Sequence, residues 1–195
     1  SNFGWSYKML YLPVEIVREA NFSLTETDTL PYFLPGVISD KIFAKGLQDL
    51  HEILSDEETP FLQQESLLWQ WLAAFISVYA GQKKKSLNSG KEDAAVKITK
   101  EYLEHHYANS VSLKDLAAVT KLNPYYLLHV FKNAVGIPPH LFQQQLRVQK
   151  AKTLLAAGST LTAVAYETGF ADQSHFSRQF KKITGLTPAG YQKMF

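Results

Sequence analysis

The sequence predicts a mainly α-helical chain: a short N-terminal extended segment and a helical hairpin, followed by two helix-turn-helix units. Three observations support this fold class. Apolar residues recur at three-to-four spacing over most of the chain, as amphipathic helices require. Glycines and prolines fall where those helices would start and stop. Residues 113–142 and 161–191 also resemble each other, which indicates an internal repeat.

Composition narrows the class of protein further. The chain has 195 residues, of which 46% are apolar and 19% charged, so it can bury a hydrophobic core. It contains no cysteine, which excludes disulfides, thiolate zinc sites and cysteine nucleophiles and is compatible with a reducing compartment. No apolar run reaches about 18 residues, and residues 1–10 lack the pattern of a signal peptide. We therefore expect no membrane segment and a cytoplasmic protein.

The charges are divided unevenly along the chain. Residues 1–90 carry 7 Lys and Arg against 11 Asp and Glu, whereas residues 91–195 carry 13 against 7. The net charges are thus −4 and +6. A basic C-terminal half favours a polyanionic partner there, although this signal is weak by itself.

The N-terminal part reads as an extended segment followed by helices. Residues 6–12 alternate as a strand would, and residues 14–20 suit a short helix. Two amphipathic helices over 40–54 and 60–80 then form a hairpin, with Asp40 as the N-terminal cap of the first. The apolar face of this hairpin is either an intrachain core or a dimer interface, and its aromatic residues slightly favour a homodimer.

A polar, basic stretch divides the chain into two parts. Residues 82–91 lack hydrophobic periodicity and contain glycine and serine, which is typical of a linker. We therefore expect an N-terminal domain over 1–81 and a C-terminal domain over 92–195. The C-terminal domain should hold about seven helices, with bounds near 93–107, 113–120, 124–135, 138–157, 161–168, 173–184 and 188–195.

The repeat places matching residues at equivalent points of two helix-turn-helix units, over 112–136 and 160–185. The small Ala117 and Ala165 match in the first helix of each unit, and Gly136 and Gly185 match at the end of the second. In such a unit the second helix enters the major groove of DNA. The helices over 124–135 and 173–184 would thus reach successive grooves if they lie about 34 Å apart.

The second unit carries a specific motif. Residues 165–191 read A-x-x-x-G-F-x-D-x-S-x-F-S-R-x-F-K-K-x-x-G-x-T-P-x-x-Y. This motif resembles the DNA-binding domain of the AraC/XylS family of transcription regulators. One departure is Gln192, where the family usually has arginine, and the first unit matches less closely.

The resemblance also extends, less specifically, to residues 1–81, which look like the tail of that family's cupin-type sensor domain. It implies a small-molecule effector bound in a largely missing N-terminal β-barrel. It further implies double-stranded operator DNA and RNA polymerase as partners, no cofactor, and a bacterial protein that is nucleoid-associated when bound to DNA.

The resemblance assigns DNA-contacting residues in both units. In the second unit it places Gln173, Ser174, Ser177 and Arg178 on the groove face, and the later position of Lys181 on the same helix favours a phosphate contact. Glutamine can pair bidentately with adenine and arginine with guanine, whereas a lysine later on the helix suits a phosphate.

The corresponding residues of the first unit are Tyr125, Tyr126, Leu128 and His129, an unusually apolar set. Leu128 and the tyrosine rings would contact thymine methyl groups, and His129 a base or a phosphate. The alternative for each tyrosine is that it packs back on the domain.

Other chemistries are poorly supported. His129 and His175 lie in different units without a nearby acid to complete a metal site, and Ser174 adjoins His175 on one helix, which is the wrong geometry for catalysis. We therefore expect no metal and no enzyme. DNA-repair methyltransferases carry a related domain but need a reactive cysteine. A purely protein-binding helical module explains neither the repeat nor the charge division.

Overall fold

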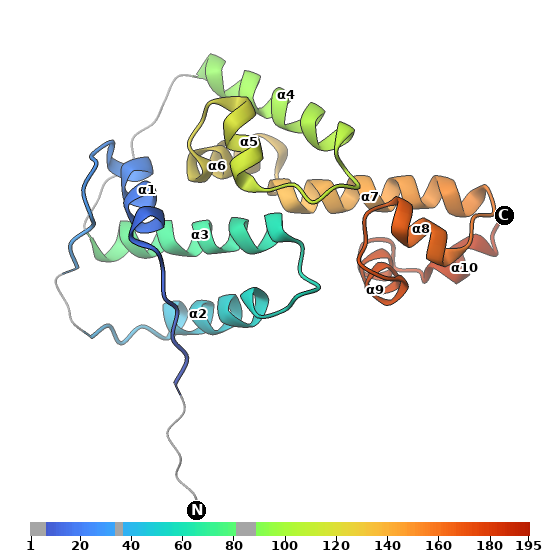
Figure 1. Cartoon of the computed structure of the whole chain (residues 1–195), viewed down its shortest axis with the longest axis horizontal. Helices are drawn as coiled ribbons and strands as arrows, with labels where there is room; N and C mark the ends of the chain where they lie inside the picture. The colour runs from blue at the N-terminus through green and yellow to red at the C-terminus, as the bar shows by residue number, and fades with distance from the viewer. Residues whose placement is uncertain (1–6, 34–36, 81–88) are drawn as a thin grey trace, which may run out of the picture. The chain divides into compact units, whose positions relative to one another are not determined.

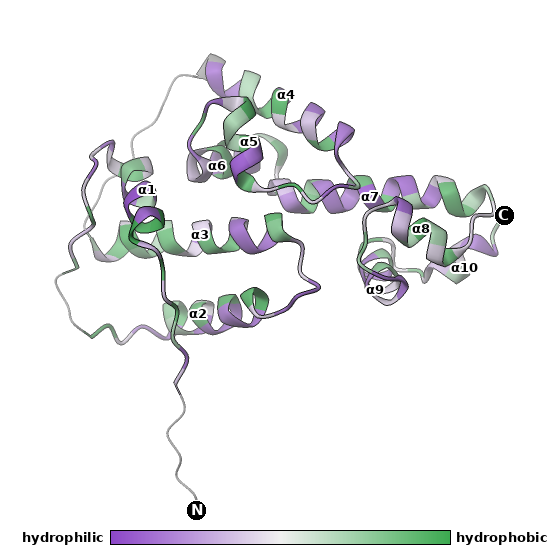
Figure 2. Ribbon diagram, viewed as in Figure 1, coloured by the Kyte–Doolittle hydropathy of each residue, from purple (hydrophilic) through white to green (hydrophobic). Residues whose placement is uncertain are grey.

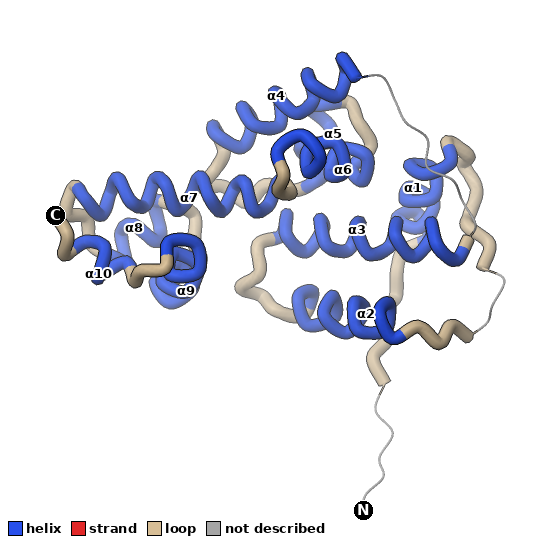
Figure 3. The backbone as a smooth tube through the Cα atoms, turned by 180° about the vertical axis from the view of Figure 1, so that it is seen from behind, coloured by secondary structure: helices blue, strands red, loops and turns tan. Residues whose placement is uncertain are grey.

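The structure, a computed structural model, describes residues 7–33, 37–80 and 89–195 (Figure 1). All regular secondary structure in these residues is helical, which confirms the mainly α class (Figure 3). The ten helices described are α1 (Val14–Thr25), α2 (Lys41–Leu54), α3 (Phe61–Tyr79), α4 (Ser89–His105), α5 (Leu113–Thr120), α6 (Pro124–Val135), α7 (Pro139–Ala156), α8 (Leu161–Glu167), α9 (Gln173–Thr184) and α10 (Pro188–Gln192).

Two local expectations near the N-terminus were wrong. Residues 7–13 have no regular structure instead of forming a strand, because the described part of the chain offers no partner strand. Helix α1 continues to Thr25 instead of ending near residue 20, since no glycine or proline interrupts the intervening segment. Most of the expected linker over 82–91 lies outside the described residues.

The chain divides into two compact units. One contains residues 1–59 and 67–87, and the other contains residues 60–66 and 88–195. The first turns of α3 thus group with the second unit and the remainder of that helix with the first. Composition gives no sign of this, because the polar stretch begins only after the helix has ended.

Aromatic packing between α2 and α3 holds the first unit together. Asp40 caps α2 by accepting hydrogen bonds from the backbone N–H groups of Ile42 and Phe43, at 2.8 and 3.1 Å. Its second carboxylate oxygen accepts a hydrogen bond from the Tyr79 hydroxyl at 2.6 Å. In Figure 2 the C-terminal half of α3 is coloured mainly hydrophobic, whereas its N-terminal half is mixed. Neighbouring rings have centroids 5.0 to 6.4 Å apart in a cluster of Phe33, Phe43, Trp71, Phe75 and Tyr79.

The second unit is built on α7, which two groups of helices share. Helices α4, α5 and α6 pack on one another, and α4 and α6 also contact α7. Helices α8, α9 and α10 likewise pack on α7 (Figure 1). Phe142, early in α7, joins a core with Val96, Val130 and Phe131. Later in α7, Val148, Ala151 and Leu155 join a separate core that contains the aromatic residues Phe170, Phe176 and Phe180.

Local capping fixes the helix ends of both helix-turn-helix units. Ser112 and Asp115 form a capping box at the start of α5. Asn123 and Thr160 cap α6 and α8 through their side chains. Left-handed glycines end the two second helices, at Gly136 and Gly185. Each unit is therefore delimited by its own sequence.

A buried histidine makes the stability of the second compact unit, residues 60–66 and 88–195, dependent on pH. His140 lies near the start of α7, and its Nδ1 has no hydrogen-bond partner in the described part of the chain. Burial lowers the pKa of His140 from 6.5 to about 4. Below pH 6.5 the unfolded chain takes up a proton that the folded chain does not, so this contribution to stability is full above that pH and is lost as pH falls towards 4.

We expect the free energy of unfolding to fall by about 1 kcal/mol between about pH 7 and 5.5 from this group. Urea unfolding at the two pH values measures the change. His140→Leu should remove this component of the difference. If the variant retained the full pH difference, other groups would have to cause it.

Candidate nucleic-acid interface

Helix α9 is held by its buried aromatic side. Phe176 and Phe180 are fully buried, with ring centroids 5.5 Å apart. They pack in the core that includes Val148, Ala151 and Leu155 of α7. Asp172 caps the helix by accepting a hydrogen bond from the backbone N–H of His175 at 2.8 Å. This hydrogen bond is the main cause that lowers the pKa of the Asp172 carboxyl. The Asp172 cap and the buried phenylalanines together fix the orientation of α9. They therefore also determine which side of the helix faces solvent.

The opposite side of α9 is polar and carries the residues expected to contact DNA. Gln173, Ser174, Arg178 and Lys181 are exposed, and Ser177 is half-buried. Their spacing places them on neighbouring turns of one side of the helix. The Gln173 side-chain oxygen accepts a hydrogen bond from the Thr162 hydroxyl of α8 at 3.0 Å. The structure thus brings these five residues together around an exposed guanidinium and an exposed ammonium group.

Helix α6 of the first unit presents fewer of its expected residues to solvent. Leu128 is only 2% exposed and belongs to the core, where we had expected a base-contacting side chain. The reason is that α6 contacts α4, α5 and α7, so its neighbours enclose a wide apolar side. The signal in the sequence was the dense apolar run of Leu127, Leu128, Val130 and Phe131, which is broader than a single stripe.

The other expected residues of α6 differ in their surroundings. Tyr125 and Tyr126 are half-buried, and the Tyr126 hydroxyl donates a hydrogen bond to Glu92 of α4. His129 is exposed, and its Nε2 lies 3.1 Å from the side-chain nitrogen of Asn133. The first unit therefore offers mainly Tyr125 and His129 to a ligand.

Sequence reasoning missed a polar cluster in the middle of α7. Gln143 and Arg147 are 3% and 5% exposed, and both donate hydrogen bonds to backbone carbonyl groups between α4 and α5. Glutamine and arginine on a helix usually belong to its solvated side, and their partners lie 34 to 40 residues away in sequence. No local pattern could have indicated this contact.

Other kinds of site are not evident in the described residues. These contain no group of three or more His, Cys, Asp or Glu side chains that could hold a metal ion. Across the same residues, none of the helices combines the length and apolar character needed to cross a bilayer.

Two helix-turn-helix units built on one shared helix, one of them with a polar and basic second helix, define a DNA-binding domain. Comparison with known proteins agrees with this class. A family profile described as a helix-turn-helix domain matches residues 116–194. The chain is also 36% identical over 170 residues to the uncharacterized HTH-type transcriptional regulator YbfI of Bacillus subtilis, covering 87% of this chain and 61% of YbfI.

Solved structures show the same fold. The C-terminal domain of AraT, a response regulator from Geobacillus stearothermophilus, matches with a TM-score of 0.50 and 26% identity, over 52% of this chain and 85% of that one. A transcriptional regulator with an AraC-type DNA-binding domain from Chromobacterium violaceum matches with a TM-score of 0.50 and 21% identity, over 55% of this chain and 96% of that one. The C-terminal part of the chain is therefore a helix-turn-helix domain that shares the fold of an AraC-type DNA-binding domain. The chain as a whole spans about three fifths of the length of YbfI.

Proposed function

We propose that this protein is a sequence-specific transcription regulator of the AraC type that reads two successive major grooves with the helices over 124–135 and 173–184. The observation that carries this proposal is the exposed polar side of α9, fixed from behind by Phe176 and Phe180. A rigid reading helix loses little conformational entropy when it binds, so its polar groups can discriminate between base pairs.

The residues of α9 have distinct roles in this proposal. Gln173 and Arg178 contact base edges, where their side chains can form paired hydrogen bonds with adenine and guanine. Ser174 and Ser177 contact bases or phosphates. Lys181 neutralises a phosphate, which positions the helix without reading sequence.

In the first unit, the exposed His129 and the half-buried Tyr125 are the main candidates on α6, and Tyr126 contributes the edge of its ring while Glu92 holds its hydroxyl. The first unit therefore contributes fewer hydrogen bonds to bases than the second.

The proposal includes partners beyond DNA. From the resemblance of residues 1–81 to the tail of a cupin-type sensor domain, we propose that a small-molecule effector bound in an N-terminal barrel controls the regulator, and that RNA polymerase is its target. We also propose a homodimer through the helices over 40–54 and 60–80. In support, α2 buries only Leu50 among its residues, and Ile42 on the same helix is 83% exposed.

Selection of bound duplexes from a random library tests the proposed function. We expect one enriched sequence with two conserved segments about one helical turn apart. Affinity for it should fall about tenfold or more between about 50 and 200 mM salt, because basic residues displace counterions from phosphates. A protein-binding module would enrich no sequence and show no such salt dependence, and that result would refute the proposal.

A further inference from the structure

A cluster of hydrogen bonds joins α7 to the loop between α4 and α5. The Arg147 Nε donates to the carbonyl oxygen of Tyr107 at 2.7 Å, and its terminal nitrogen donates to that of Asn109 at 3.0 Å. Gln143, one turn earlier on α7, donates to the same two oxygens at 3.2 and 3.1 Å. Four hydrogen bonds thus hold the loop that leads into the first helix-turn-helix unit to the middle of the shared helix.

The same arginine also contacts the second helix-turn-helix unit. Its Cζ lies 5.8 Å from the ring centroid of Phe170, within the range of a cation–π interaction. Phe170 is buried and packs against Phe176 of α9, with ring centroids 5.3 Å apart. Arg147 therefore touches the loop that leads into the first unit and the core of the second.

A direct contact between the second unit and the α4–α5 loop lies beside this arginine. Gly169, in the turn between α8 and α9, has a φ of +78°. A Cβ atom at this position would lie 2.1 Å from the carbonyl oxygen of Ala108, between the two residues that Arg147 binds. The turn of the second unit thus packs against the α4–α5 loop, which leads into the first unit.

A packing role alone does not account for a buried guanidinium at this point. Burial lowers the pKa of Arg147 to about 10, so the side chain is still charged at neutral pH. A buried charge costs desolvation free energy, which an apolar side chain of similar size avoids. Only arginine offers fixed, divergent N–H donors to two carbonyls together with a planar face for an aromatic ring.

We propose that Arg147 is a positioning residue that fixes the orientation of α9 relative to α6 and thereby sets the spacing between the two DNA segments that the protein accepts. The part of this proposal that concerns DNA rests on the proposed function. The part that concerns the two units can be tested without DNA.

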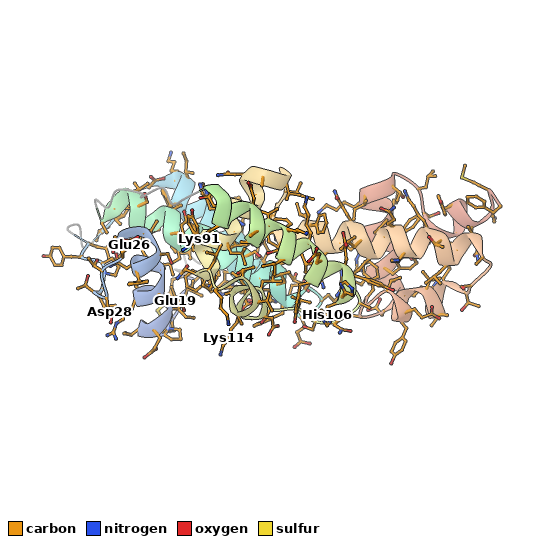
Figure 4. The ribbon with its side chains drawn as sticks, turned by 90° about the horizontal axis from the view of Figure 1, so that it is seen from above. Glu19, Glu26, Asp28, Lys91, His106 and Lys114 are labelled. Atoms are coloured by element: carbon orange, nitrogen blue, oxygen red, sulfur yellow. The ribbon has the colours of Figure 1, made fainter. Side chains whose placement is uncertain are left out.

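The chain contains no cysteine, so spin labels can be attached at two introduced cysteines only. Lys114→Cys on α5 and Lys182→Cys on α9 place one label in each unit at exposed positions, and Figure 4 shows where Lys114 lies. Pulsed electron paramagnetic resonance should give one narrow distance distribution for the parent chain. Arg147→Met should broaden it. Arg147→Lys should broaden it less, because lysine keeps the charge but loses the paired geometry.

Val148→Ala is the matched control, because Val148 is the adjacent residue on α7 and is buried in the second core. It should lower the melting temperature but leave the distribution narrow. If Arg147→Met does not fold, Gln143→Met removes two of the four hydrogen bonds and should give intermediate broadening. An unchanged distribution in the variants of Arg147 and Gln143 would overturn the proposal.

The consequence for DNA is measured on the selected sequence with single base pairs inserted or removed between its two segments. The parent should lose about tenfold in affinity or more for each step away from the preferred spacing. Arg147→Met should flatten this profile to within about threefold, while its affinity for either isolated segment stays within about twofold of the parent. A sharp profile in the variant would refute the role of Arg147. A flat profile in the parent would instead refute reading by two units, and the label distances would then decide the role of Arg147.

Discussion

Gly169→Ala should destabilise the C-terminal domain by about 4 kcal/mol or more, the largest effect expected from a single methyl group in this chain. The added Cβ would meet the backbone of Ala108, 2.1 Å from its oxygen and 2.7 Å from its carbonyl carbon. Neither atom is the end of a flexible side chain, so the α8–α9 turn or the α4–α5 loop would have to move. Urea unfolding followed by circular dichroism measures the loss.

Gly185→Ala separates the steric effect from backbone strain. Gly185 has nearly the same conformation, with a φ of +80°, but a Cβ there would meet no atom within 4 Å. Gly185→Ala should therefore lower the free energy of unfolding only by the strain of holding alanine in the left-handed conformation, about 1–2 kcal/mol. Equal losses from the two substitutions would show that the contact with Ala108 contributes nothing.

Arg178→Ala should remove discrimination at one base pair, at a cost of about 1–3 kcal/mol for the preferred base. Arg178 is exposed on the polar side of α9, two turns from the glycine that ends the helix. Binding of a panel of duplexes, each with one substituted base pair, locates the position at which the preference is lost.

Lys181→Ala is the matched control for this panel, because Lys181 lies on the same helix one turn later. Lys181→Ala should weaken binding to all duplexes about equally. It should also reduce the magnitude of the slope of log affinity against log salt concentration by about 1, because one phosphate contact is lost. If Arg178→Ala also weakened all duplexes equally, Arg178 would be a phosphate contact.

The helices of the C-terminal domain could be predicted closely because their ends are set by neighbouring residues. The bounds expected for the helices over 113–120, 124–135 and 173–184 are those observed. The residues that set these ends lie within one turn of them, so the sequence alone identifies them. They are Ser112 with Asp115, Pro124, Gly136 and Gly185.

What could not be predicted depends on contacts between distant residues. Leu128 looks like a surface residue of a reading helix, but neighbouring helices enclose it. Arg147 looks like a solvated charge, but its partners Tyr107 and Asn109 come from another part of the chain. The strand expected over 6–12 needed a partner that sequence alternation cannot supply.

Guanine methylation interference on the selected sequence tests most directly whether two units read two major grooves. Methylation at N7 blocks contacts in the major groove only. We predict two clusters of interfering guanines about one helical turn apart on one face of the duplex, and loss of one guanine from the second unit's cluster in Arg178→Ala. A single cluster, or a pattern in Arg178→Ala identical to that of the parent, would contradict the assignment of α9 as a reading helix beside a second reader.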